Sequence, residues 1–144
     1  MHFFDKLLNK GNLVETIVVP SGIEDKLVLF DFYSNAFHFP DWFGRNWDAL
    51  LDCLRDLRDD SKQICIQHSD VPFLSNPRDL EKYLNVLFLT CILHKGNIVV
   101  LFQDECQDMI DNVILAYWQR MSNAIKTKED VVAAATKVVF PQGV

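Results

Sequence analysis

The sequence feature that most restricts the fold is an uninterrupted apolar run of strand length, Ile98–Phe102. A strand that is apolar on both faces has to be covered on both, which is typical of the centre of a parallel sheet. Two other segments have strand patterns. Glu15–Val19 is rich in β-branched and apolar residues, and Gln63–His68 alternates apolar with polar residues. We therefore predict about three core strands.

Segments of helical length separate these strands. The first helix should begin at the capping-box pattern Ser21-Gly22-Ile23-Glu24, in which a hydroxyl and a carboxylate satisfy free backbone donors. It should end before Phe39-Pro40, because the residue before a proline avoids the helical region and proline has no N–H to donate. Apolar spacing, Asn46 as an N-cap and Gly96 as a C-cap define the other helices. We expect helices at about 22–37, 47–59, 80–94, 107–124 and 129–137.

Strands that alternate with helices predict an α/β domain in which a small, mostly parallel sheet is packed by helices and joined by right-handed crossovers. The chain has 144 residues, which is the size of one domain. It contains no internal repeat, no low-complexity tract and no linker-like segment. We therefore expect a single compact unit.

Composition narrows the classes of function. With 14 Lys and Arg against 20 Asp and Glu, the net charge is −6, which opposes direct binding to nucleic acid and favours a basic partner. The N-terminus lacks the pattern of a signal peptide, and no apolar stretch is long enough to cross a membrane. We expect reduced thiols, no metal or other cofactor and a cytoplasmic location, because no CxxC pair occurs among Cys53, Cys65, Cys91 and Cys106.

The predicted helix at 47–59 carries a row of acids. Its inward face is an apolar stripe at helical spacing, made by Ala49, Leu50, Cys53, Leu54 and Leu57. Its outward face has Asp48, Asp52 and Asp56 at i, i+4 and i+8. Each like-charged pair costs about 0.2–0.5 kcal/mol, and aspartate is a poor residue for a helix interior. Stability alone does not explain such a row.

Two interpretations of the row stay open. In the first it is an ordinary solvated face, and three nearby arginines offset part of the repulsion, namely Arg45, Arg55 and Arg58. In the second the carboxylates take the place of substrate phosphates in a partner's basic cleft. Trp42, Trp47 and Leu51 would then supply apolar contacts around them.

The sequence around the row resembles the barstar family. Residues 39–54, FPDWFGRNWDALLDCL, follow the family pattern: a hydrophobic residue, Pro, any residue, two aromatics, Gly, any residue, Asn, any residue, Asp-Ala-Leu, any residue and Asp-Cys-Leu. The order of strands and helices over about 15–102 is similar to the family fold. The resemblance implies a barstar-like three-layer α/β core over 15–102 within a single domain of residues 1–144, with a helical C-terminal extension over 103–144.

The resemblance also implies a function. Barstar-like proteins are inhibitors, not enzymes, and this chain would be an immunity protein that blocks the active site of a toxic, basic ribonuclease domain. By position, an aromatic contact over the active-site mouth falls on Trp42, and the inhibitory aspartates fall on Asp48 and Asp52, the second reaching deepest. Gly44 would let the backbone approach the enzyme. The expected toxin-binding residues are Trp42, Gly44, Asn46, Trp47, Asp48, Leu51, Asp52 and Asp56.

Two features depart from the family. Cys91 stands five residues before Gly96, where the prototype has a second acidic contact. The extension begins with the acidic run Asp104–Asp108 and has an apolar stripe, which favours a structural cover for the sheet over a surface for a different toxin or a dimer contact. This stripe consists of Val113, Tyr117, Trp118 and Met121.

Two other functions stay open. The same fold would serve as a binding module that neutralises a non-ribonuclease toxin or regulates another basic protein, which the departures at Cys91 and 103–144 favour. An enzyme would need Asp48 and Asp52 to hold Mg²⁺, or a Cys-His nucleophile pair. The chain has no HExxH-like pattern, and its histidines lie beside apolar residues, where surface or loop roles are common. We expect a monomer or a weak homodimer.

Overall fold

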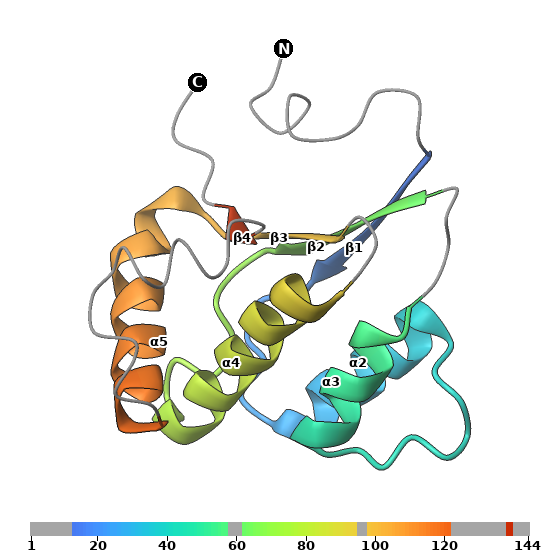
Figure 1. Cartoon of the computed structure of the whole chain (residues 1–144), viewed down its shortest axis with the longest axis horizontal. Coiled ribbons are helices and arrows are strands. Elements are labelled where there is room, and N and C mark those ends of the chain that lie inside the picture. Colours follow the sequence, from blue (N-terminus) through green and yellow to red (C-terminus); the bar gives the residue numbers. More distant parts are fainter. Residues whose placement is uncertain (1–12, 58–61, 95–97, 122–137, 140–144) are drawn as a thin grey trace.

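The computed structural model describes residues 13–57, 62–94, 98–121 and 138–139. Strands and helices alternate along the chain (Figure 1), which confirms the α/β prediction. The elements are β1 (Leu13–Val19), α2 (Lys26–Phe37), α3 (Trp47–Arg55), β2 (Lys62–His68), α4 (Pro77–Leu93), β3 (Ile98–Leu101), a short 3₁₀ turn (Asp104–Cys106), α5 (Gln107–Met121) and β4 (Val138–Val139).

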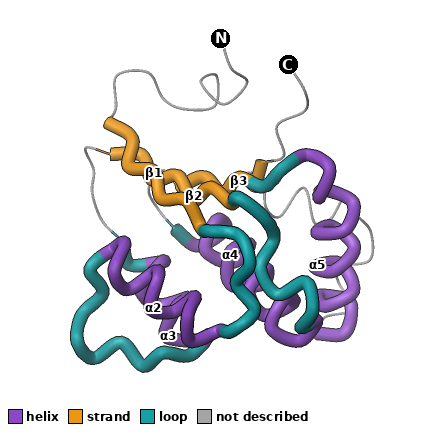
Figure 2. The backbone as a smooth tube through the Cα atoms, turned by 180° about the vertical axis from the view of Figure 1, so that it is seen from behind, coloured by secondary structure: helices purple, strands orange, loops and turns teal. Residues whose placement is uncertain are grey.

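The strands form one parallel sheet in the order β1-β2-β3-β4. In its register Ile17 lies opposite Ile66, and Ile66 lies opposite Val100. The three predicted strands are β1, β2 and β3, and β4 adds a two-residue strand beside β3. The described helices all lie on one side of the sheet, as the two opposite views agree (Figures 1 and 2). Of the three layers that we expected, the described residues form two.

The main core lies between the sheet and the helices. Strand residues such as Ile17, Ile66 and Val100 point into it and pack against buried helix residues such as Leu50 and Leu84. A second, small cluster lies on the opposite face of the sheet and consists of Cys65, Val99 and Leu101. The strand β3 is therefore buried on both faces, as its apolar sequence predicts.

The predicted capping box at Ser21–Glu24 is wrong. Its glutamate carboxylate instead accepts from the backbone N–H of Ser75, at 3.3 Å, and so ties this turn to the loop after β2. The helix begins at Lys26, and the N-cap is Asp25, whose carboxylate accepts from the N–H of Leu27 at 2.9 Å. Glu24 therefore forms a tertiary hydrogen bond in place of the local capping bond that its sequence position predicts.

The other helix boundaries differ less. The helix α4 begins at Pro77, three residues earlier than predicted, because Asn76 caps it and proline suits the first helical position. The described part of α3 ends at Arg55 and that of α5 at Met121. The predicted C-cap Gly96 and the predicted helix at 129–137 lie outside the described residues.

We expected the extension to cover the sheet. Of its described residues, α5 instead packs on α4, and β4 pairs with β3 at the edge of the sheet. The ring of Trp118 meets that of Phe88 edge to face at 6.0 Å, and its indole N–H donates to the side-chain oxygen of Asn85 at 2.9 Å. Ile110 and Ile114 are buried beside it. Met121 is 67% exposed, so its assignment to the buried stripe is wrong. The helix α5 therefore widens the helical layer on one side of α4.

Two histidines are buried, contrary to the surface or loop roles that we expected. The Nδ1–H of His68 donates to the carbonyl of Leu101 at 2.9 Å, which leaves Nε2 to accept from the Tyr83 hydroxyl at 2.7 Å. Because that hydroxyl has one proton, it must accept from the Tyr33 hydroxyl at 2.6 Å. His94 donates from Nε2 to the carbonyl of Leu57 at 2.8 Å. The two residues join the sheet to α4 and α4 to the end of α3.

Acid should destabilise the fold through His68. Burial lowers the pKa of this imidazole to about 4, against about 6.5 in an unfolded chain. Between these values the unfolded state binds more protons than the folded state. The contribution of neutral His68 to the free energy of unfolding is therefore fully present above about pH 6.5 and is lost as the pH falls toward 4, by about 3 kcal/mol at most. Urea unfolding of the wild type and of His68→Gln at pH 7, 6 and 5 measures this. The variant should show a flatter pH dependence, and an equal slope in both proteins would contradict the assignment.

Candidate functional site

Aromatic contacts hold the loop that leads into α3. The ring of Phe43 lies 5.0 Å from that of Phe39 and 6.2 Å from that of Phe30 on α2. The N–H of Phe43 also donates to the carbonyl of Pro40 at 2.9 Å. Trp42 points out of this anchored turn and is 76% exposed. The loop thus presents a large indole to solvent from a fixed backbone, as expected for a contact residue.

Asn46 caps α3, as predicted. Its Oδ1 accepts from the N–H of Ala49 at 2.8 Å, and its Nδ2 donates to the carbonyl of Gly44 at 3.3 Å. A Cβ on Gly44 would lie 3.1 Å from that Nδ2, so the glycine makes room for the cap. Arg45 adopts a left-handed backbone conformation, with a φ of 50°. Arg45 is held by two hydrogen bonds of 3.1 Å to Asp31 on α2.

Trp47 lies mostly against the core, which departs from its expected place beside the acids. Its ring meets Phe30 at 4.9 Å, Phe73 at 5.8 Å and Tyr83 at 6.1 Å. Its indole Nε1 is buried and has no hydrogen-bond acceptor within the described part of the chain. Together with the inward stripe, of which Leu50, Cys53 and Leu54 are buried, this ring fixes how α3 is rotated.

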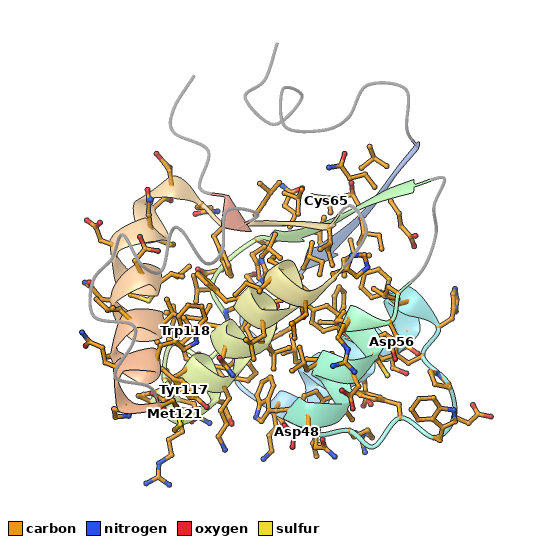
Figure 3. All side chains as sticks on the ribbon, viewed as in Figure 1. Asp48, Asp56, Cys65, Tyr117, Trp118 and Met121 are labelled. Carbon is orange, nitrogen blue, oxygen red and sulfur yellow. The ribbon has the colours of Figure 1, made fainter. Side chains whose placement is uncertain are left out.

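The acid row faces outward. Asp48, Asp52 and Asp56 are all exposed, and Figure 3 shows Asp48 at the end of α3 far from the sheet and Asp56 closer to it. Arg55 lies 3.2 Å from a carboxylate oxygen of Asp52 and 3.7 Å from one of Asp56. Asp48 forms no ion pair or hydrogen bond with any residue that the structure describes. Because Arg45 is bound to Asp31, only one described arginine offsets the row.

The pairs with Arg55 leave the carboxylates available. The side chains of Asp52 and Asp56 are 58% and 68% exposed, and exposed pairs between neighbours on one helix contribute only about 0.3–0.5 kcal/mol. A partner that offers better-placed cations can therefore replace Arg55 at small cost. The row is not turned inward, and the described residues do not fully neutralise it.

The chemistry of the site favours binding over catalysis. Burial raises the pKa of the Cys53 thiol, and the charges of Asp52 and Asp56 raise it further, so the reactive thiolate is disfavoured. Within the described ranges, no group of three or more His, Cys, Asp or Glu side chains has an arrangement that would hold a metal ion. Cys91 is buried on α4, so the position of the missing acidic contact presents no group to a partner.

A pocket of about 420 Å³ lies beside the acid row, which sequence reasoning missed. Its lining residues come from three helices and include Asp48 and Leu51 of α3, Lys82 and Asn85 of α4 and Tyr117 of α5. No local sequence pattern predicts this pocket, because the pocket forms only where α5 docks on α4. The loop indole, the acid row and this pocket are thus all open to solvent. Asn46 and Trp47 line the pocket and also hold the start of α3 in place through the cap and the core contacts.

The described residues form an α/β domain with a four-stranded parallel sheet, and its helix α3 displays an exposed row of carboxylates. Comparison with protein-family models matched residues 15–102 to the family described as Barstar (barnase inhibitor). This match spans more than half of the chain, which therefore belongs to the barstar family. Members of that family are inhibitors rather than enzymes. Comparisons with curated proteins and with solved structures found no match.

Two further findings concern the described helices. None of the described helices is long and apolar enough to span a membrane. The side chain of Asn46 uses its oxygen for the N–H of Ala49 and its Nδ2 for the carbonyl of Gly44.

Replacing Asn46 should destabilise the fold. Asn46→Ala removes the acceptor for the Ala49 N–H and should lower the free energy of unfolding by about 1 kcal/mol. Asn46→Asp keeps the acceptor oxygen and should retain most of the stability, so it is the matched control. Urea unfolding followed by circular dichroism measures both. Equal loss in the two variants would show that the cap is not what Asn46 contributes.

Proposed function

We propose that this protein is an immunity protein that binds a toxic ribonuclease and blocks its active site with α3 and the preceding loop. The observation that carries the proposal is the exposure of Asp48 and Asp52 on a helix whose rotation is fixed by its cap and its buried face. Membership in a family described as a barnase inhibitor supports the same function. We place its action inside the cell that it protects.

The mechanism that we propose has an electrostatic and a steric part. The acid row attracts a basic enzyme and speeds encounter, as complementary charge does for many protein pairs, of which barnase and barstar are themselves a standard example. In contact, Asp52 exchanges its bond to Arg55 for charge-assisted hydrogen bonds with phosphate-binding residues of the enzyme. Those residues are then unable to bind RNA, and the body of α3 fills the cleft.

Apolar contacts around the carboxylates complete the proposed interface. Trp42 has most of its indole free to cover the rim of the enzyme's cleft. Leu51 is half-buried on the same face of α3 as the acids. Such contacts exclude water from the charged pairs and so strengthen them.

Inhibition of RNA cleavage tests the proposal directly. The full chain is titrated into fluorogenic RNA assays with barnase and with the protein encoded immediately upstream of this chain. We expect stoichiometric inhibition of at least one, with one inhibitor molecule bound per enzyme by calorimetry. Unchanged cleavage by both enzymes at micromolar inhibitor would refute ribonuclease inhibition.

Asp52 should matter far more for binding than for folding. Asp52→Asn should weaken inhibition by about 30-fold or more, the general cost of removing one partner of a desolvated charge pair, whereas its melting temperature should stay near the wild-type value because the Arg55 pair is exposed. Glu105→Gln removes the same charge from an exposed residue outside the acid row and should leave inhibition almost unchanged. Equal loss in both variants would assign the effect to net charge and not to the site.

A second candidate function is a binding module for a basic protein that is not a ribonuclease. The burial of Cys91 favours it, because the family's second acidic contact is then missing. In that case the basic partner should bind with one-to-one stoichiometry and with the same dependence on Asp52, and the RNA cleavage assay should show no inhibition.

A further inference from the structure

The pocket beside the acid row is lined by residues of the family core and by Tyr117 of the extension. It lies between α3, α4 and α5, and Asp48 and Leu51 belong both to it and to the face that we propose for toxin binding. Its volume of about 420 Å³ is within the range of about 300–1,000 Å³ that is typical of ligand pockets. A partner that covers α3 must therefore also cover this pocket.

Tyr117 is held in place as a wall of the pocket. The guanidinium of Arg120 lies 5.6 Å from the centre of its ring, and the same guanidinium binds Glu81 of α4 at 2.6 Å. The ring therefore lies against a guanidinium that also links α5 to α4. Figure 3 shows Tyr117 and Asp48 on the side of the molecule away from the sheet, and both line the pocket. The residue comes from outside the matched range 15–102.

The charges that line the pocket cancel, unlike those of the acid row. Asp48 contributes one negative charge and Lys82 one positive charge, and the other lining groups are neutral. The apolar part of the lining consists of aromatic and aliphatic side chains, namely Trp47, Leu51, Val86, Leu89 and Tyr117. A balanced, apolar and aromatic pocket favours an uncharged side chain, because a cation would be opposed by Lys82 and an anion by Asp48.

We propose that this pocket receives an aromatic anchor residue, a tyrosine, from a loop of the basic partner, and that α5 thereby determines which partner is accepted. The ring would pack between the walls formed by Trp47 and Tyr117 at the distances usual for aromatic pairs. Its hydroxyl would donate to the carboxylate of Asp48, which has no bond within the described part of the chain. Large aromatic residues seated in pockets are common hot spots of protein interfaces.

This inference rests on the proposed function only for the source of the tyrosine, so a small probe tests the pocket separately. The isotope-labelled full chain is titrated with N-acetyl-tyrosinamide and, in parallel, with N-acetyl-argininamide, and pocket resonances are followed by NMR. The tyrosine probe should shift the indole N–H of Trp47 and the methyl groups of Leu51 and Leu89. It should bind more tightly than the arginine probe.

Three variants sharpen the test. Tyr117→Ala should weaken the tyrosine probe by about tenfold, the loss expected for one hot-spot contact. Met121→Ala, on the same helix but highly exposed and outside the pocket lining, should leave it unchanged. Lys82→Glu, which does not depend on α5 remaining folded, should change the affinity less than about twofold for an uncharged occupant and should raise it for a cationic one.

The outcomes separate the pocket from the proposed function. Tighter binding of the arginine probe, or no shift at the pocket, would overturn the aromatic anchor even if the chain inhibits a ribonuclease. Pocket resonances that shift with protein concentration alone, and not in Tyr117→Ala, would assign the pocket to a second copy of this chain and would also overturn it. Binding of the tyrosine probe without inhibition of either ribonuclease would keep the pocket and refute the proposed function.

Discussion

The packing of Trp47 against α2, α4 and the loop after β2 is the contact on which the proposed interface depends. Its ring meets Phe30, Phe73 and Tyr83, and it directly follows the N-cap Asn46. A helix of nine residues has little stability of its own, so its rotation is set by what its buried face contacts. With that face fixed inward, Asp48 and Asp52 can only face solvent. The orientation of the acids is thus a product of aromatic packing.

The acid row is unfavourable for the local stability of α3. Like charges along one helix repel, and among the described residues only Arg55 forms ion pairs with them. The fold tolerates the repulsion because the cost of exposed charges is small beside the burial of Leu50 and Leu54 on the opposite face. Because the carboxylates are exposed, their repulsion costs little free energy, and they also stay accessible to a partner. The neighbouring pocket adds neutral, aromatic surface, so in the proposed interface attraction and selectivity would lie on adjacent surfaces.

Much of the site was predictable from local sequence, and the errors have one cause. The cap at Asn46 and the outward acids were predicted correctly because they depend on residues within one turn of helix. The capping box failed because the Glu24 carboxylate binds the N–H of Ser75, 51 residues away. Trp47 was placed outward because helical periodicity does not reveal which aromatic side chains will meet across the core.

The sequence by itself determined the α/β class, the parallel sheet around Ile98–Leu101 and the row of carboxylates on α3, because hydrophobic periodicity and residue type are local properties. Only the tertiary structure decided that His68 is buried in a chain of hydrogen bonds, that Arg45 binds Asp31, and that α5 docks on α4 so that Tyr117 borders the same pocket as Asp48. These features join residues far apart in the chain. Their positions are set by the packing of whole helices, which no pattern within a single segment contains.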